Sequence, residues 1–144
     1  MPILITPYLF LLTLIHSSVS VPSDMKIEIS GIQNAKGHIL IAVFNQADGF
    51  PDESSKAFRK ERIQAKTGSI SFVLTGLPAG KYAIGIVHDE NDNMKLDTGL
   101  FGIPKEGFCF SNAAMGTFGP PSFEAAAILH PSKNQPHKLV VKYW

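Results

Sequence analysis

The sequence predicts an all-β protein, an antiparallel two-sheet β-sandwich of six to seven strands with immunoglobulin-like or transthyretin-like architecture. Three observations support this prediction. Short segments alternate apolar and polar residues, turns rich in proline and glycine separate them, and almost no segment has the period of a helix. We identify no internal repeat in the chain.

Six segments have the pattern of strands. Residues 25–30 alternate apolar and polar side chains, as a half-buried strand does. Residues 38–44 are apolar on both faces and are expected to form a central strand. The remaining segments comprise residues 70–74, 82–86, a weaker one at 123–129, and 139–143.

The turns agree with these strands. Residues 34–37 have the length of a hairpin turn, and residues 77–80 place proline and glycine where a type I turn prefers them. Residues 51–62 are predicted to be a short helix or an irregular crossover that begins near Asp52. This segment carries a local basic patch, expected to be a solvated face, made of Lys56, Arg59, Lys60 and Arg62.

The N-terminal segment predicts export. Residues 3–15 are uncharged and mostly apolar, and the run is shorter than the roughly 20 residues of a membrane span. It fits the core of a signal peptide at residues 1–20, with small residues at Ser18 and Ser20 before the cleavage point. The alternatives are an uncleaved anchor and a buried N-terminal strand. We therefore expect a periplasmic or extracellular single domain at residues 21–144, with no transmembrane segment in the mature chain.

Charge and cysteine content narrow the classes of function. Thirteen basic against twelve acidic residues leave a net charge of +1, so the chain has no basic field to bind nucleic acid. The single cysteine, Cys109, excludes an intrachain disulfide. Because Phe108 and Phe110 flank it, we expect Cys109 to be an inert core residue rather than a nucleophile.

Residues 88–121 form a long segment without an obvious strand. Loops of this length in a compact domain are usually functional or disordered. Disorder is not expected, because the segment holds six large apolar residues that should need burial. They are Leu100, Phe101, Ile103, Phe108, Phe110 and Phe118. We therefore predict one long ordered loop that packs on itself.

The start of this loop resembles the first half of a calcium-binding loop. Asp89, Asn91 and Asn93 place oxygen-bearing side chains at alternate positions. Lys95 would supply its backbone carbonyl at the seventh position and Asp97 a side chain at the ninth. Calcium is thus the candidate cofactor.

The match to a calcium loop is incomplete. The sixth position is Met94 instead of glycine, and the twelfth is Leu100 instead of a bidentate glutamate. Glu106 is the nearest acid that could complete the site. The alternative is a polar turn in which Asn and Asp side chains bond to their own backbone.

Several runs of residues together resemble a known family. They are Leu77-Pro78-Ala79-Gly80-Lys81-Tyr82-Ala83, His88-Asp89-Glu90-Asn91 with Asn93 and Lys95-Leu96-Asp97, Phe101-Gly102-Ile103-Pro104-Lys105-Glu106-Gly107, and Phe110-Ser111-Asn112. The chain is similar, from about Lys26 to Tyr143, to the bacterial domain-of-unknown-function family numbered 2141. That resemblance implies a small exported bacterial protein without an established activity. It also implies that the acidic loop and Glu106 form one feature. Two departures are Met94, where the family often has glycine, and Cys109, where a small residue is expected.

The leading functional hypothesis is an exported, non-catalytic binding or accessory module, stabilised by calcium through residues 89–97. Glu106, Ser111 and Asn112 are its candidate binding residues, and the partner would be an unidentified protein or small ligand. One alternative is a periplasmic hydrolase or isomerase that uses His88, Asp89, Glu106 and Ser111. Adjacent strand residues such as His88 and Asp89 point to opposite faces, however, which favours a structural histidine. A further alternative is a structural subunit whose edge strand pairs with a partner.

Overall fold

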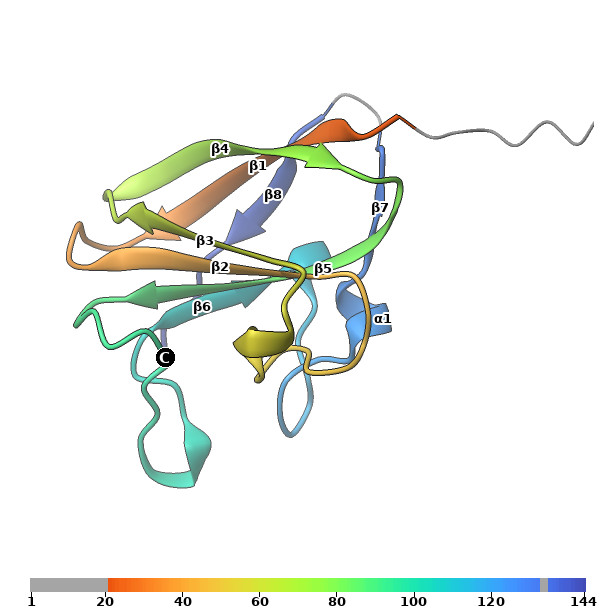
Figure 1. The fold of residues 1–144 in the computed structure, drawn as a ribbon. Helices are drawn as coiled ribbons and strands as arrows, with labels where there is room; N and C mark the ends of the chain where they lie inside the picture. The colour runs from red at the N-terminus through yellow and green to blue at the C-terminus, as the bar shows by residue number, and fades with distance from the viewer. Residues whose placement is uncertain (1–20, 133–134) are drawn as a thin grey trace, which may run out of the picture.

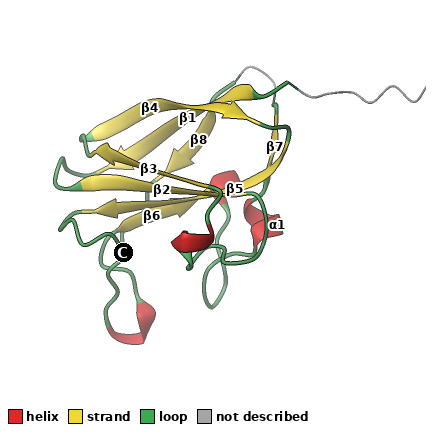
Figure 2. Ribbon diagram, in the orientation of Figure 1, coloured by secondary structure: helices red, strands yellow, loops and turns green. Residues whose placement is uncertain are grey.

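The computed structural model describes residues 21–132 and 135–144, and it confirms the all-β sandwich (Figures 1 and 2). The predicted signal peptide lies outside the described residues. The described residues form eight strands in two sheets, against the six to seven expected. The first sheet has the order β4 (Gly68–Leu77), β1 (Ser23–Ile32), β8 (His137–Val140). The second has the order β3 (Arg59–Gln64), β2 (His38–Phe44), β5 (Gly80–Asp89), β6 (Gly107–Phe110), and β7 (Ile128–His130) also pairs with β5.

The main core lies between the two sheets. Alternate residues of β1 are buried, beginning with Met25, Ile27 and Ile29, as the two-residue period predicts. From the other sheet, Ile41 and Ile86 join the same cluster. The central position of β2 is confirmed, because it pairs with β3 on one side and with β5 on the other.

A second apolar cluster lies on the outer face of the five-stranded sheet. Phe44 and Ala83 belong to it, and they face away from the main core because they alternate with residues that point inward. Phe123 and Ala126 cover this face from a short helix, α1 (Phe123–Ala126). The prediction of a strand over 123–129 was therefore wrong in its first half. The Ser122 hydroxyl accepts a hydrogen bond from the Ala125 amide (3.2 Å) and caps the helix instead.

The segment at 51–62 contains a short 3₁₀ turn and the first part of a strand. A 3₁₀ turn, η1 (Ser54–Lys56), agrees with the predicted short helix, but β3 begins at Arg59. The basic patch is thus partly on an edge strand, where charged side chains discourage pairing with other chains. The strand was not predicted from the sequence, because only Ile63 of the six residues in β3 is strongly apolar.

Two further predictions needed correction. Residues 88–121 contain a strand, β6, which pairs with β5 and is uniformly apolar rather than alternating. The sandwich is also not wholly antiparallel, because β8 runs parallel to β1. Beyond β8 the chain reaches the other sheet, where Lys142 forms an isolated bridge with Phe108. Among the described residues, no helix has the length and apolar character needed to cross a membrane.

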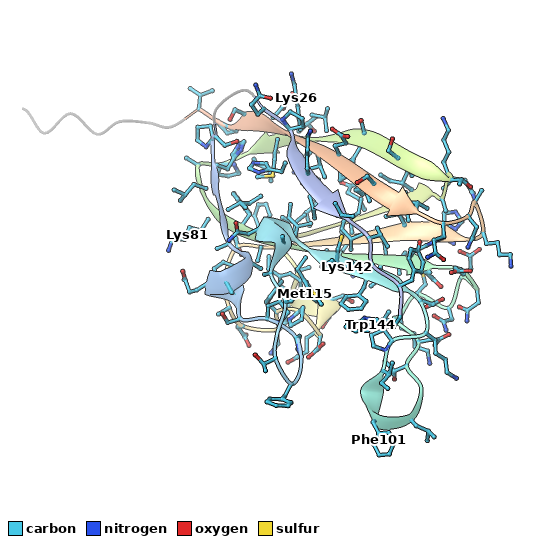
Figure 3. The ribbon with its side chains drawn as sticks, turned by 180° about the vertical axis from the view of Figure 1, so that it is seen from behind. Lys26, Lys81, Phe101, Met115, Lys142 and Trp144 are labelled. Atoms are coloured by element: carbon cyan, nitrogen blue, oxygen red, sulfur yellow. The ribbon has the colours of Figure 1, made fainter. Side chains whose placement is uncertain are left out.

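Two loops extend from the same end of the sandwich, as both views show (Figures 1 and 3). The first follows β5, contains the turn η2 (Leu100–Gly102) and returns into β6. The second follows the turn η3 (Ser111–Ala113) and ends at α1. These two loops hold most of the residues singled out in the sequence.

Candidate functional site

The base of the first loop is organised by two buried carboxylates. Asp89, the last residue of β5, is 0% exposed, and its two oxygens accept hydrogen bonds from the backbone amides of Asn93 (3.1 Å) and Met94 (2.9 Å). Glu106, directly before β6, is 5% exposed and accepts from the amides of Glu90 and Asp97 (3.0 Å each). Four backbone N–H groups of the loop are thus satisfied by two side chains, which holds its shape. The implied link between the acidic loop and Glu106 is present.

Asn91 and Asn93 form two consecutive turns of the Asx type. The Asn91 oxygen accepts from the Asn93 amide (3.2 Å), and the Asn93 oxygen accepts from the amide of the exposed Lys95 (3.1 Å). Both side-chain NH₂ groups donate to the Asp97 carboxylate, at 2.6 and 2.8 Å. These hydrogen bonds, first from Asn93 and then from Asn91, hold the pKa of Asp97 below its usual value. The polar turn is therefore the arrangement in the structure, and calcium binding stays a prediction.

The acidic residues do not gather around one point. In residues 21–132 and 135–144, no group of three or more His, Cys, Asp or Glu side chains is placed to hold a metal ion. Asp89 and Glu106 turn toward backbone amides, and Asp97 turns toward two amide side chains. A calcium site here requires the Asn91 and Asn93 side chains to rotate so that their oxygens join the Asp97 carboxylate.

The outer side of the turn is fastened to the sheet by Asp92. Its carboxylate lies 2.6 Å from Nδ1 of His38 and accepts a hydrogen bond from Arg62 (3.0 Å). The His38 contact is the main cause of the lowered pKa of Asp92. Sequence reasoning missed both partners, because they lie on β2 and β3, far from the loop along the chain.

The backbone at Met94 explains one departure from the family pattern. Its φ of 65° lies in the left-handed region, where glycine is favoured. Methionine adopts this conformation at an energetic cost, offset here by the hydrogen bond from its amide to Asp89.

Two of the candidate acid–base residues, His88 and Ser111, are buried in separate places. His88 is 0% exposed and has Nε2 at 2.8 Å from the carbonyl oxygen of Lys36, so Nε2 carries the proton. Its Nδ1 accepts from the Tyr143 hydroxyl (2.6 Å). The Ser111 hydroxyl accepts from the Ile84 amide (2.9 Å), which lies four residues before His88 on β5, roughly 13 Å away. The structure therefore does not bring His88 and Ser111 together.

Ser111 and Asn112 connect strand β6 to helix α1. The Ser111 hydroxyl donates to the carbonyl of Ala126, and the Asn112 side chain donates to the carbonyl of Ala125 (2.9 Å). Asn112 has a φ of 56°, which asparagine tolerates better than most residues. Both predicted binding residues thus have partners within the chain that define a turn.

Cys109 lies on the inner face of β6, opposite Ile86. It is 5% exposed, which confirms the expected buried position. Burial raises the pKa of its thiol to about 12. A thiol with so high a pKa is a poor nucleophile at neutral pH.

The apex of the first loop overturns one expectation. Leu100, Phe101 and Ile103 were expected to be buried, but they are 83%, 99% and 54% exposed. Phe101 also has a φ of 60°, a strained conformation for a bulky residue. Figure 3 shows Phe101 at the tip of the loop, pointing away from the sandwich.

The second loop presents the same character. Phe118 is 101% exposed and Met115 is 42% exposed, again against the expectation of burial for Phe118. Trp144, the C-terminal residue, is 77% exposed, and its neighbour Tyr143 packs against Gly107 at the base of the first loop. This end of the molecule therefore carries several large apolar side chains in solvent. Only Phe108 and Phe110 of the six expected residues pack into the protein, where they contact each other and Phe110 also contacts Phe50.

Comparison with known proteins gives a family and no function. Residues 27–138 match the family described as "Uncharacterized protein conserved in bacteria (DUF2141)". No curated protein and no solved structure matches the chain. The geometry of the two loops is therefore the basis for a functional proposal.

Proposed function

Since the chain belongs to this uncharacterized bacterial family, we propose from its geometry that it is an exported binding or accessory β-sandwich module that makes contact through the two loops at one end. One observation carries the proposal. Leu100, Phe101 and Phe118 stand in solvent at the loop tips, at 83%, 99% and 101% exposure. Exposed large apolar side chains that cluster at one end of a domain mark interaction sites.

The base of the first loop supports the same proposal. Four backbone amides are bound to the buried carboxylates of Asp89 and Glu106, so the loop leaves the sandwich in a defined direction. A tip held in place before contact loses less conformational entropy on binding. Recognition residues on loops of a rigid sandwich are a common arrangement.

A position-specific crosslinking experiment tests the module. A photoreactive amino acid replaces Phe101 or Phe118 in the full chain in its native host, and Leu129 serves as the matched control. Leu129 is 67% exposed on β7, outside the two loops. We expect adducts from both tips and none from Leu129. Equal labelling at all three positions, or none at the tips, contradicts the proposal.

Export is the part of the proposal that comes from the sequence. The apolar run at residues 3–15 and the small residues Ser18 and Ser20 support a cleaved signal peptide. N-terminal sequencing of protein from the native host should begin near Val21. An intact Met1 on a cytoplasmic protein contradicts export while leaving the loop proposal to be tested separately.

Calcium binding at residues 89–97 is a second candidate property. Its support is the set of oxygens around Asp97, which calcium would draw together if the Asn91 and Asn93 side chains rotate. A ligand at a hundredfold excess over Kd stabilises the fold by about 2.7 kcal/mol, which raises Tm on the order of 10 °C here. We expect calcium to raise Tm more than magnesium does, and Asp97→Ala to remove the difference. No shift at ~10 mM calcium, above the weakest affinities of extracellular calcium modules, leaves only the polar turn.

A further inference from the structure

The two loop tips share one sequence pattern. Residues 99–104 read Gly-Leu-Phe-Gly-Ile-Pro, and residues 116–121 read Gly-Thr-Phe-Gly-Pro-Pro. Both copies have the form Gly-X-Phe-Gly-X-Pro. The phenylalanine of each copy, Phe101 or Phe118, is the most exposed large apolar residue of its loop, at 99% and 101%. No internal repeat was expected from the sequence, since a six-residue pattern is too short to define a structural unit, but the exposure of both phenylalanines gives this one meaning.

Both copies are tight reversals of the chain. In the first, the Gly99 amide donates to the carbonyl of Ile103 (2.7 Å), and Thr98 bridges to Pro104. In the second, a Cβ on Gly116 would lie 1.8 Å from the carbonyl oxygen of Gly119, so only glycine permits this approach. In each copy the phenylalanine therefore lies at the turn, between the two ends that close it.

Neither tip carries a charge. Residues 98–104 contain no Asp, Glu, Lys or Arg, and residues 113–121 contain none either. The charged residues that flank the first tip are Asp97 and Lys105, and the Lys105 side chain lies 3.2 Å from the position that a Cβ on Gly99 would occupy. Both charges are thus set back from the apex, on the neck of the first loop, and the Asp97 carboxylate accepts hydrogen bonds from Asn91 and Asn93.

We propose that Phe101 and Phe118 insert together into the interfacial region of a lipid bilayer. This inference rests on the proposed function and names the chemistry of its partner. Two separate convex tips fit a flat, deformable surface without shape complementarity, whereas a protein partner would need two matched pockets. Uncharged tips enter hydrocarbon without the cost of burying a charge, and the charges of Asp97 and Lys105 stay on the neck, among the polar headgroups. Trp144, an exposed residue of a type enriched at membrane interfaces, lies back from the tip that Phe101 marks, beside the neck of the first loop (Figure 3).

Vesicle binding tests the inference on the protein as its native host produces it. Flotation with phosphatidylcholine vesicles, and with phosphatidylethanolamine–phosphatidylglycerol vesicles, measures affinity for neutral and anionic lipid. We expect similar binding to both kinds of vesicle, because insertion of apolar side chains supplies the affinity and the charges of Asp97 and Lys105 beside the first tip are opposite in sign. Trp144, the single tryptophan of the chain, should shift its fluorescence to shorter wavelength on binding.

The decisive variants are Phe101→Ser with Phe118→Ser, compared with Leu129→Ser. We expect the double variant to lose at least about tenfold in vesicle affinity, and each single variant to lose part of it. Leu129→Ser, at an apolar residue outside the loops that is 67% exposed, should bind as the unaltered protein does. Unchanged Tm for the double variant shows that the loss is not misfolding.

The outcomes separate this inference from the proposed function. No vesicle binding, or equal binding by the double variant, overturns membrane insertion. If tip crosslinking in cells then yields protein adducts, the binding module stands with a protein partner. If the tips give no adduct at all, both proposals fail.

Discussion

The base and the apex of the first loop differ in which side chains they bury: the base buries charged groups, and the apex exposes apolar ones. At the base, the carboxylates of Asp89 and Glu106 are buried. At the apex, Leu100 and Phe101 are almost fully in solvent. Soluble proteins usually place these classes of side chain the other way round.

The two regions differ in whether contacts within the protein offset the unfavourable burial or exposure. Burying a carboxylate is costly unless it is hydrogen-bonded, and Asp89 and Glu106 each accept from two backbone amides. At the apex, exposure of Phe101 and its φ of 60° are both unfavourable for the isolated protein. The base is therefore explained by folding alone, whereas the exposed apex supports the proposed contact with something outside the chain.

The largest effect is expected from removing a carboxylate at the base. Glu106→Ala leaves the Glu90 and Asp97 amides without their acceptors. Hydrogen bonds to charged groups contribute about 1.5–3 kcal/mol each, so we expect a loss of about 3 kcal/mol or more and a fall in Tm on the order of 10 °C. Thermal unfolding measures this loss.

The matched variant Glu106→Gln sharpens the comparison. It keeps the shape of the side chain and one oxygen acceptor but turns an NH₂ group toward the second amide. Its Tm should lie between those of the unaltered protein and Glu106→Ala. If Glu106→Ala unfolds at the same temperature as the unaltered protein, the base is not what holds the loop.

A smaller effect is expected at Cys109, on the strand that carries the base. Cys109→Ser places a hydroxyl in an apolar site, so we expect a loss of roughly 1–3 kcal/mol. Chemical unfolding checks the loss. Burial and a pKa of about 12 also predict slow labelling of the native thiol, and rapid labelling at neutral pH would show that β6 opens readily.

A still smaller effect is expected from acid, which should destabilise the turn at residues 91–97. The pKa of Asp97 is lowered from 3.8 by hydrogen bonds from Asn93 and Asn91, and that of Asp92 is lowered mainly by His38. A carboxyl whose folded pKa is depressed stabilises the fold above its unfolded pKa, and this contribution is lost as the pH falls through the folded value. Amide exchange or chemical shifts of residues 91–97 should therefore change below about pH 4. Asp97→Asn should remove that part of the pH response, and a change centred near neutral pH would contradict the assignment.

The smallest effect is expected at the apex. Phe101→Gly removes a solvent-exposed ring and relieves the strain of the left-handed backbone, which stabilises the folded state. Glycine also gives the unfolded chain more conformational entropy, which offsets this gain. We expect the free energy of unfolding to stay equal or to rise by less than about 1 kcal/mol, while vesicle binding falls. A loss above ~1 kcal/mol would mean that Phe101 belongs to the folded structure and not to an interaction site.

Much of the fold could be predicted from local patterns. Strand β1 was visible because its buried residues alternate with polar ones, and β2 because it is apolar throughout. Strand β6 was missed because four uniformly apolar residues carry no period, and β3 because its edge position permits charges on most of its residues. The start of the 123–129 segment was mistaken for strand, since the alternation of its apolar residues concealed the cap at Ser122.

The candidate site divides in the same way. The sequence alone predicted that residues 89–97 form either a calcium-binding loop or a polar turn, because Asp and Asn at alternate positions can bind a cation or bond to the backbone nearby. The link to Glu106 was implied by the family resemblance. The sequence also determined that Cys109 is flanked by apolar residues and is a core position. It could not determine whether Asn91 and Asn93 turn oxygen or nitrogen toward Asp97, which depends on how the whole loop closes.

Only the tertiary structure decided which apolar residues of the long loop are inside. Phe110 and Phe118 are the same residue type in the same segment, yet one packs against Phe50 and the other is fully exposed. Hydrophobicity is a property of the side chain, so the sequence shows it directly. Burial depends on which distant strands return to cover that side chain, and at the two glycine-bounded tips no described strand does so.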